Sequence, residues 1–171
     1  MEQFQTLLKN GIEFSARGPK VTLQDIAEIE QMIQAPLPEQ YRDYLLHANG
    51  GVLYKLKNEK IDYPCSKVYW PKEIKTDAEY VILSDFLSTV HPEFKTKTLR
   101  YSFETWKEHL PEYTLPFGHN PGTGYFLIGY GAENRGKIYY WCYYQRICGF
   151  IADSFIELIQ GIVPHTAIDD W

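Results

Sequence analysis

Residues 116–141, PFGHNPGTGYFLIGYGAENRGKIYYW, constrain the fold more than any other stretch of the sequence. They hold six glycines between runs of aromatic and aliphatic residues. A phosphate-binding loop of the Walker type would need such glycines to open a helix, with Lys followed by Ser or Thr. Here the glycines lead into YFLIGY, which is typical of a β-strand, and no such pair follows. A dinucleotide-binding motif also needs a helix after its glycines, so we set nucleotide binding aside.

The same stretch predicts a β-hairpin. The runs GYFLIGYG and GKIYYWCYY are separated by AENR, with Gly131 and Gly136 at the corners, where glycine can adopt positive φ. HNPGTG predicts another turn just before the hairpin. Both faces of the second run carry aromatic or apolar side chains, Tyr139, Trp141 and Tyr143 on one and Ile138, Tyr140 and Cys142 on the other. We expect this strand to be covered on both sides, or to use its outer face as a contact surface.

Two amphipathic helices are predicted upstream. In VTLQDIAEIEQMIQ, apolar residues fall on one face at helical spacing, namely Leu23, Ile26, Ile29 and Ile33. Thr22 is placed to cap this helix, with Asp25 completing a capping box. In APLPEQYRDYLLHANGG, Pro38 suits a first helical turn. A stripe of Tyr41, Tyr44, Leu45 and Ala48 follows, and Asn49 and Gly50 predict a left-handed helix end.

The rest of the chain alternates between strand and helix patterns. GVLYKL and AEYVILSDFL are predicted strands, and residues 58–77, with Pro64 and Pro71, are predicted to be irregular. SFETWKEHL predicts a short helix between Ser102 as N-cap and Pro111 as stop.

A last helix is predicted in DSFIELIQGI, with Asp153 as cap and Gly161 at its end. Its packing residues are expected to be Phe155, Ile156, Leu158 and Ile159. Helices near both ends with strands between them predict an α+β fold with helices packed on an antiparallel sheet. The chain carries no repeat, low-complexity tract or linker, so we expect residues 1–171 to form one domain.

The charge balance argues against nucleic-acid binding. Lys and Arg total 17 against 22 Asp and Glu, for a net charge of −5, whereas nucleic-acid binders usually need a basic footprint. The most basic run, Lys95, Lys97 and Arg100 beside Phe94 and Tyr101, is expected to be a solvated edge. An acidic domain is better suited to a basic partner protein, because complementary charge speeds encounter.

Composition also indicates the compartment. Apolar runs fall short of the ~20 residues that cross a bilayer, and the N-terminus, with Glu2 and no long apolar core, does not resemble a signal peptide. Three cysteines, Cys65, Cys142 and Cys148, are odd in number and lack the spacing of a disulfide framework. We therefore expect a protein of a reducing cytoplasm.

No catalytic or metal site is predicted. His119 and Cys142 could in principle form a nucleophilic pair, but a cysteine within an aromatic strand is usually a small buried hydrophobe. Cys142 and Cys148 lack a second ligand pair for zinc. His47 is placed at a helix end, and His91, His109 and His165 near element ends or in loops. The acidic pairs Glu28–Glu30 and Asp169–Asp170 do not converge as acid–base catalysis requires.

Three blocks in this order resemble the SUKH superfamily, also called Smi/Knr-like. The blocks are LPEQYRDYLLHANGG, LPFGHNPGTGYFLIGYGAENRGKIYYW and DSFIELIQGI. The matching residues are Leu37, Pro38, Tyr41, Leu45, Asn49, Gly50 and Gly51, then Pro116, Phe117, Gly118, Gly124, Gly136, Ile138 and Tyr139, then Ser154 and Phe155. The resemblance spans about residues 22–160, and 58–110 depart from the pattern.

The resemblance implies an α+β domain built on an antiparallel, strongly curved sheet with helices packed on it, without enzymatic activity or cofactor. Founding members are fungal regulators of cell-wall synthesis, and bacterial members look like immunity proteins against polymorphic toxins. The implied function is to bind and block a cognate toxin domain, such as a nuclease, in the cytoplasm. Two alternatives stay open: a regulatory scaffold that docks a housekeeping partner, and, ranked lower, a small-molecule binder or enzyme using an aromatic cleft around Trp141.

The family residues are expected to be structural, with Leu37 and Tyr41 in the core and the glycines in turns. Contacts to the partner are expected in loops, at strand ends and in the C-terminal tail. The candidates are Asp77, Glu79, Glu133, Asn134, Arg135, Asp169, Asp170 and Trp171. We expect a protein partner, without direct nucleic-acid or membrane contact, and leave the oligomeric state open.

Overall fold

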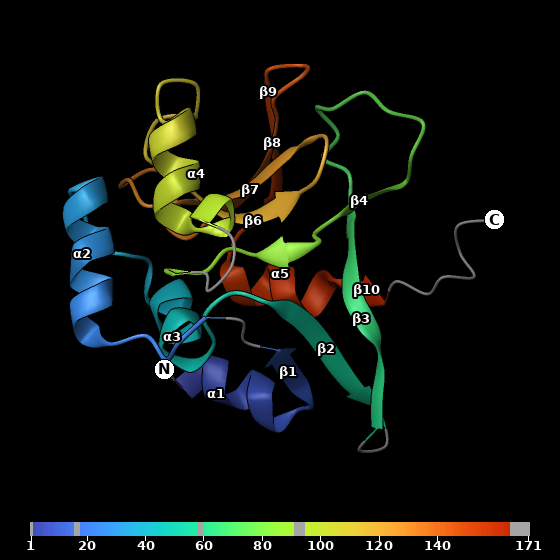
Figure 1. Cartoon of the computed structure of the whole chain (residues 1–171). Coiled ribbons are helices and arrows are strands. Elements are labelled where there is room, and N and C mark those ends of the chain that lie inside the picture. Colours follow the sequence, from blue (N-terminus) through green and yellow to red (C-terminus); the bar gives the residue numbers. More distant parts are fainter. Residues whose placement is uncertain (1, 16–17, 58–59, 91–94, 165–171) are drawn as a thin grey trace.

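The computed structural model describes residues 2–15, 18–57, 60–90 and 95–164 (Figure 1). The helices are α1 (Glu2–Lys9), α2 (Leu23–Ile33), α3 (Glu39–His47), α4 (Leu99–Trp106) and α5 (Phe155–Gly161), with a 3-10 turn η1 (Lys95–Lys97). The strands are β1 (Ile12–Ser15), β2 (Val52–Lys57), β3 (Lys60–Tyr69), β4 (Tyr80–Ile82), β5 (Asp85–Phe86), β6 (Thr114–Asn120), β7 (Gly124–Gly129), β8 (Ile138–Cys142), β9 (Ile147–Ala152) and β10 (Val163–Pro164). The predicted α+β class is confirmed.

The strands form two antiparallel sheets. The first has the order β1-β2-β3-β10, with β4 also paired to β3, and the second runs β5-β6-β7-β8-β9. A bridge between Gly51 and Phe86 joins them through two backbone hydrogen bonds of 3.1 and 2.8 Å. The single run AEYVILSDFL, predicted as one strand, is divided between β4 in the first sheet and β5 in the second.

An aromatic core fixes one face of the second sheet. Tyr44 of α3 lies 5.3 Å from the ring of Phe86 and 5.1 Å from that of Phe155. Tyr41 and Phe117 complete the cluster, and the rings are buried. Through these contacts α3 and α5 pack on the sheet, and α1 packs on both helices (Figure 1).

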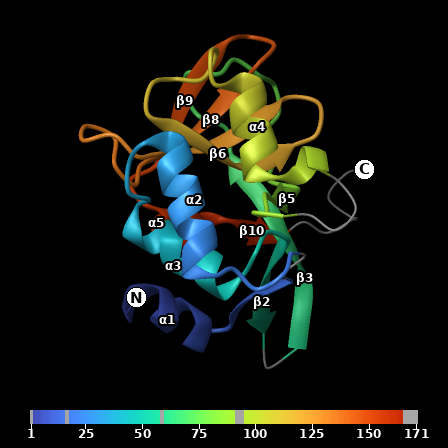
Figure 2. The ribbon, with the colours of Figure 1, turned by 60° about the vertical axis from the view of Figure 1, so that its left-hand side comes forward.

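The helix α4 covers the opposite face of this sheet and lies in front of its strands in Figure 2. Its last residue, Trp106, lies 5.4 Å from the ring of Trp141 on β8 and 5.8 Å from that of Tyr143. On the other face, Tyr140 meets the ring of Trp70 at 5.3 Å. The expectation that β8 is covered on both sides is therefore confirmed.

The helix α2 follows the prediction, apart from its first residue. The capping box of Thr22 and Asp25 is present, and Ile26, Ile29 and Ile33 are buried. Leu23, however, is 65% exposed. It is the first helical residue, and side chains on a helix lean toward its N-terminus, so this one extends beyond the layer it was expected to join.

The helix α3 has the predicted start and buried stripe, but it ends differently. Ala48 follows the helix in an extended conformation with φ −138°, so the predicted left-handed cap is wrong. Gly50 and Gly51 have φ of +73° and +99° and instead turn the chain into β2. A side chain at Gly50 would place its Cβ 2.9 Å from the Phe86 carbonyl oxygen, because the two sheets meet there.

The prediction of irregular structure for residues 58–77 is wrong over its first half. Residues 60–69 form β3, a strand of 10 residues that pairs with β2, β4 and β10. Pro64 is tolerated because it stands where the register with β2 shifts, between Tyr54 and Leu56. Residues 70–79 lie outside regular helices and strands, as expected.

The starts of two helices also differ from the prediction. The helix α4 begins at Leu99 with Thr98 as its cap, and Ser102, the predicted cap, is buried within the helix. Its last helical residue is Trp106, before Pro111 is reached. Ser154, and not Asp153, caps α5, because its hydroxyl accepts a hydrogen bond from the Glu157 backbone N–H.

Candidate functional site

The glycine-rich stretch forms the predicted hairpin and serves as scaffold. A Cβ at Gly124 would lie 1.9 Å from the backbone oxygen of Trp141, and one at Gly118 would lie 2.4 Å from Cδ1 of Leu83. These glycines allow β7, β8 and the segment before β5 to approach closely. Gly136, with φ +79°, closes the turn before β8. The stretch thus leads from strand to strand, without the helix of a phosphate cradle.

Arg135, a predicted contact residue at the hairpin turn, binds the body of the protein. Its Nη1 donates to the backbone oxygens of Pro36 and Tyr130 at 3.1 and 3.2 Å, and its Nη2 donates to that of Leu37 at 2.9 Å. These bonds join the turn between β7 and β8 to the segment that enters α3.

Asn134, another predicted contact, is also held within the fold. Its Oδ1 accepts from the backbone N–H of Gly131 at 2.9 Å, and its Nδ2 donates to the backbone oxygens of Glu112 and Tyr113 at 3.3 and 3.4 Å. Glu133, the third candidate in the turn, is exposed. Of the three, Glu133 is the one whose side chain is best placed for a partner.

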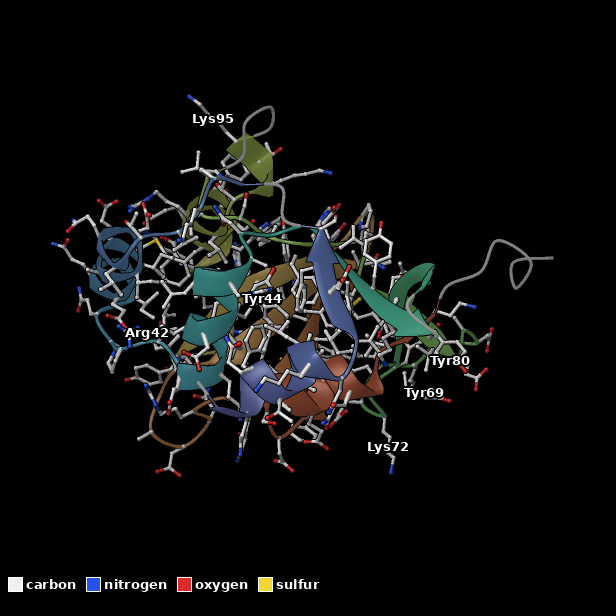
Figure 3. All side chains as sticks on the ribbon, turned by 90° about the horizontal axis from the view of Figure 1, so that it is seen from below. Arg42, Tyr44, Tyr69, Lys72, Tyr80 and Lys95 are labelled. Atoms are coloured by element: carbon white, nitrogen blue, oxygen red, sulfur yellow. The ribbon has the colours of Figure 1, made fainter. Side chains whose placement is uncertain are left out.

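An aromatic pair with an exposed ring lies at the end of β3 and β4. Tyr69 and Tyr80 face each other across these strands, with ring centroids 4.7 Å apart, and Tyr69 is 57% exposed. The Tyr80 hydroxyl donates to that of Tyr69 at 3.3 Å, and Nζ of Lys67 lies 5.5 Å from the Tyr80 ring centroid. Figure 3 shows both tyrosines at the side of the molecule that also carries Lys72.

Asp77 and Glu79 adjoin this pair. Both are exposed in the connection between β3 and β4, and Glu79 directly precedes Tyr80. The hydrogen bond to Tyr69, together with burial and the Glu79 carboxylate, raises the pKa of Tyr80 to about 12. We call Lys67, Tyr69, Asp77, Glu79 and Tyr80 the β3–β4 patch. It combines the exposed ring of Tyr69 and the partly exposed ring of Tyr80 with two exposed carboxylates in the connection that precedes β4.

His119 and Cys142 cannot act as a catalytic pair. His119 pairs with Tyr125, which pairs with Trp141, whereas Cys142 pairs with Gly124, which pairs with Asn120. Directly paired residues share a face and successive residues alternate, so the two side chains lie on opposite faces of the sheet. Burial lowers the pKa of His119.

Cys142 is buried, as predicted for a small hydrophobe within an aromatic strand. All three cysteines are free, Cys65 is also buried, and burial raises the pKa of the half-buried Cys148 to about 12. Such a thiol is a poor nucleophile and metal ligand, because both roles need the thiolate. Over the described ranges, the His, Cys, Asp and Glu side chains form no group of three that could hold a metal ion.

The surroundings of Trp141 form a small aromatic pocket. Trp141 itself is only 4% exposed. The pocket has a volume of about 200 Å³ and is lined by Trp106, His109, Trp141, Tyr143 and Arg146. Drug-sized ligands usually occupy about 300–1,000 Å³. Sequence reasoning identified Trp141 but missed Trp106 and Arg146, since their approach depends on α4 crossing the sheet.

The other positions singled out from the sequence lie outside the patch and the pocket. Lys95 and Arg100 are exposed as expected, and Lys95 projects into solvent away from the tyrosine pair (Figure 3). Lys97 instead pairs with Asp85 at 3.3 Å. His91, His165, Asp169, Asp170 and Trp171 lie outside the described residues. None of the helices in the described part of the chain has the length and apolar character needed to cross a bilayer.

The sequence profile of the SMI1 / KNR4 family (SUKH-1) matches residues 20–161, from just before α2 to the end of α5. The chain belongs to this family. A search of the curated proteins found no match. The SUKH-1 match includes the aromatic core, the hairpin and the β3–β4 patch, whereas α1 and β1 precede it. Two of its expected core residues, Leu37 and Tyr41, are buried, as predicted.

Proposed function

We propose that this SUKH-1 protein is an immunity protein that binds a cognate toxin domain, such as a nuclease, and neutralises it by direct occlusion in the cytoplasm. The whole chain would act as a single non-enzymatic domain. Family membership supports a protein-binding role, because SUKH proteins typically bind partner proteins. The structural observation that supports it best is the β3–β4 patch.

The patch has the composition of a protein interface. Tyrosine is enriched among the residues that dominate binding energy, since it buries a large ring at little entropic cost and keeps a polar tip. Here Tyr69 and Tyr80 are already fixed by strand pairing and by their mutual hydrogen bond. Little conformational entropy therefore remains to be lost when a partner covers them.

The charge of the patch favours a basic partner. Asp77 and Glu79 are exposed beside the tyrosines, and the chain as a whole carries −5. Domains that act on nucleic acid usually present basic surfaces, which an acidic protein can approach rapidly and cover. Steering of this kind weakens with added salt, so association should slow as the ionic strength rises.

A charge-reversal experiment tests this contact. The chain is co-purified with a catalytically inactive form of the C-terminal domain encoded by the adjacent gene. We expect Asp77→Lys with Glu79→Lys to weaken the complex by at least about tenfold. The matched control is Glu28→Lys with Glu112→Lys, two exposed acids elsewhere on the surface. Equal binding by both double variants would remove the patch from the interface.

The alternative is a regulatory interaction module of the Smi/Knr type. Membership of the SMI1 / KNR4 family favours it equally, because the family is named for such regulators. A large toxin gene directly upstream supports immunity, whereas a housekeeping neighbour and capture of its product would support regulation.

A further inference from the structure

An aromatic cluster lies on the face of the second sheet that α4 covers, at the turn between β8 and β9. Trp106, at the end of α4, stacks on Tyr143 with ring centroids 5.8 Å apart and planes only 8° apart. Trp141 meets the Trp106 ring edge-on at 5.4 Å. Tyr144, the next residue in the turn, lies 4.5 Å from Tyr143 and is 73% exposed.

Two cationic or potentially cationic side chains border this cluster. Arg146 and His109 line the 200 Å³ pocket together with the three rings and are both exposed. Among the described residues, neither side chain has a hydrogen-bond or ion-pair partner. The pocket therefore combines three aromatic rings with two side chains that have no partner among the described residues, on a chain that is acidic overall.

The backbone at Arg146 is unusual. Its φ is +53°, in the left-handed region, where Gly or Asn is the ordinary choice for a turn residue. The turn thus carries an arginine in a conformation that disfavours it. This position holds the guanidinium group at the rim of the pocket.

We propose that this pocket receives one apolar side chain of the partner protein, while a neighbouring carboxylate of the partner binds Arg146 and His109. A volume of about 200 Å³ suits a single side chain better than a drug-sized ligand. Trp, Tyr and Arg are the residues most enriched in the anchoring centres of interfaces. The Arg146 guanidinium group is suited to a bidentate carboxylate contact.

This inference rests on the proposed function, because it assumes a protein partner. The structure connects the pocket to the β3–β4 patch. Nε2 of Gln145 donates to the backbone oxygen of Lys75 at 3.1 Å. Pro71 and Glu73 also approach Gly149, at which an added Cβ would lie 2.2 Å from Cβ of Pro71. The β8–β9 turn therefore supports the connection that carries Asp77 and Glu79. A partner with both basic and acidic contacts could meet both surfaces at once.

The chemistry of the pocket can be tested without a partner. Phenylacetate carries a ring and a carboxylate, and benzylamine carries the same ring with the opposite charge. We expect phenylacetate to shift the indole N–H signals of Trp106 and Trp141 saturably in nuclear magnetic resonance spectra, and benzylamine to bind at least about tenfold more weakly. Arg146→Glu should remove this preference. Equal responses to the two probes, or a response unchanged by Arg146→Glu, would overturn the proposal.

The role in partner binding needs matched variants. Against the inactive toxin domain, Arg146→Glu and Tyr144→Ala should each weaken binding by at least about tenfold. Arg42→Glu and Tyr113→Ala, at exposed positions on other elements, should change it less than about twofold. If the wild-type chain binds the toxin domain and Arg146→Glu binds it equally well, this inference is refuted and the proposed function stands. Selective phenylacetate binding without toxin binding supports the pocket chemistry and counts against the proposed function.

Discussion

Arg135 illustrates how an exposed charged residue can act within the fold. Its three hydrogen bonds to backbone oxygens fix the β7–β8 turn against the start of α3. We expect Arg135→Ala to lower the free energy of unfolding by about 1–2 kcal/mol, a value kept low because the side chain is partly solvated. Glu133→Ala in the same turn should change it by less than about 0.5 kcal/mol. Urea denaturation measures both, and equal effects would contradict the assignment.

Arg146, in contrast, is expected to contribute to partner binding and not to the stability of the fold. Replacement by Gly relieves the left-handed backbone but adds freedom to the unfolded chain, so stability should stay constant or rise by up to about 1 kcal/mol. Partner binding should fall, because the guanidinium group is lost. Gln34→Gly is the control, since Gln34 has a similar φ of +55° at the end of α2. If Arg146→Gly weakened binding no more than Gln34→Gly does, Arg146 would have no role in recognition.

His119 predicts a pH dependence of stability. Burial lowers its pKa in the folded protein below the ordinary 6.5. Between the two pKa values the unfolded chain binds more protons than the folded protein, so stability falls as the pH drops below 6.5. We expect His119→Gln to lose less stability than the wild type between about pH 7.5 and pH 5.5. Parallel denaturation curves for the two proteins would show that His119 does not contribute.

At the scale of elements, the β7–β8 ladder should be the part least tolerant of added volume. Gly124→Ala would place a methyl group 1.9 Å from a backbone oxygen of the neighbouring strand. We expect it to cost at least about 3 kcal/mol, or to prevent folding. Gly161→Ala, in open space at the end of α5, should instead stabilise by about 0.5–1 kcal/mol. Thermal and urea denaturation distinguish these outcomes.

The elements that could be predicted are those specified by neighbours in the sequence. The capping box and apolar spacing of α2, the stripe of α3 and the β7–β8 hairpin depend on local patterns. By contrast, β3 was missed because Pro64 suggested a loop, and the register shift that accommodates it depends on β2. Likewise, nothing within AEYVILSDFL indicates that its two halves join different sheets.

The same distinction applies to the candidate sites. Asp77 and Glu79 could be chosen from the sequence as exposed acids, but the tyrosine pair beside them requires the pairing of β3 with β4. Asn134 and Arg135 looked like contact residues because they are polar and in a turn, while their backbone acceptors lie in distant segments. The pocket at Trp141 needs α4 to cross the sheet, a tertiary feature without a local signal.

At the scale of the whole molecule, we propose that two surfaces contact the partner. One is the acidic β3–β4 patch, and the other is the aromatic pocket with Arg146, connected through Gln145 and Lys75. The patch is built on the paired strands β3 and β4, and the pocket on the second sheet and α4. The partner would therefore meet a surface that changes little on binding. We therefore expect fast association that depends on salt and slow dissociation governed by the buried rings.

Cell survival measures the proposed neutralisation of a toxin domain. The C-terminal domain encoded by the adjacent gene, in its active form, is expressed in a host cell, alone and together with the full chain. We expect the wild-type chain to restore growth and to co-purify with the toxin domain, and Asp77→Lys with Glu79→Lys to lose protection while the chain stays folded. Growth arrest in the presence of the wild-type chain, without a complex, would contradict the immunity function for that pair.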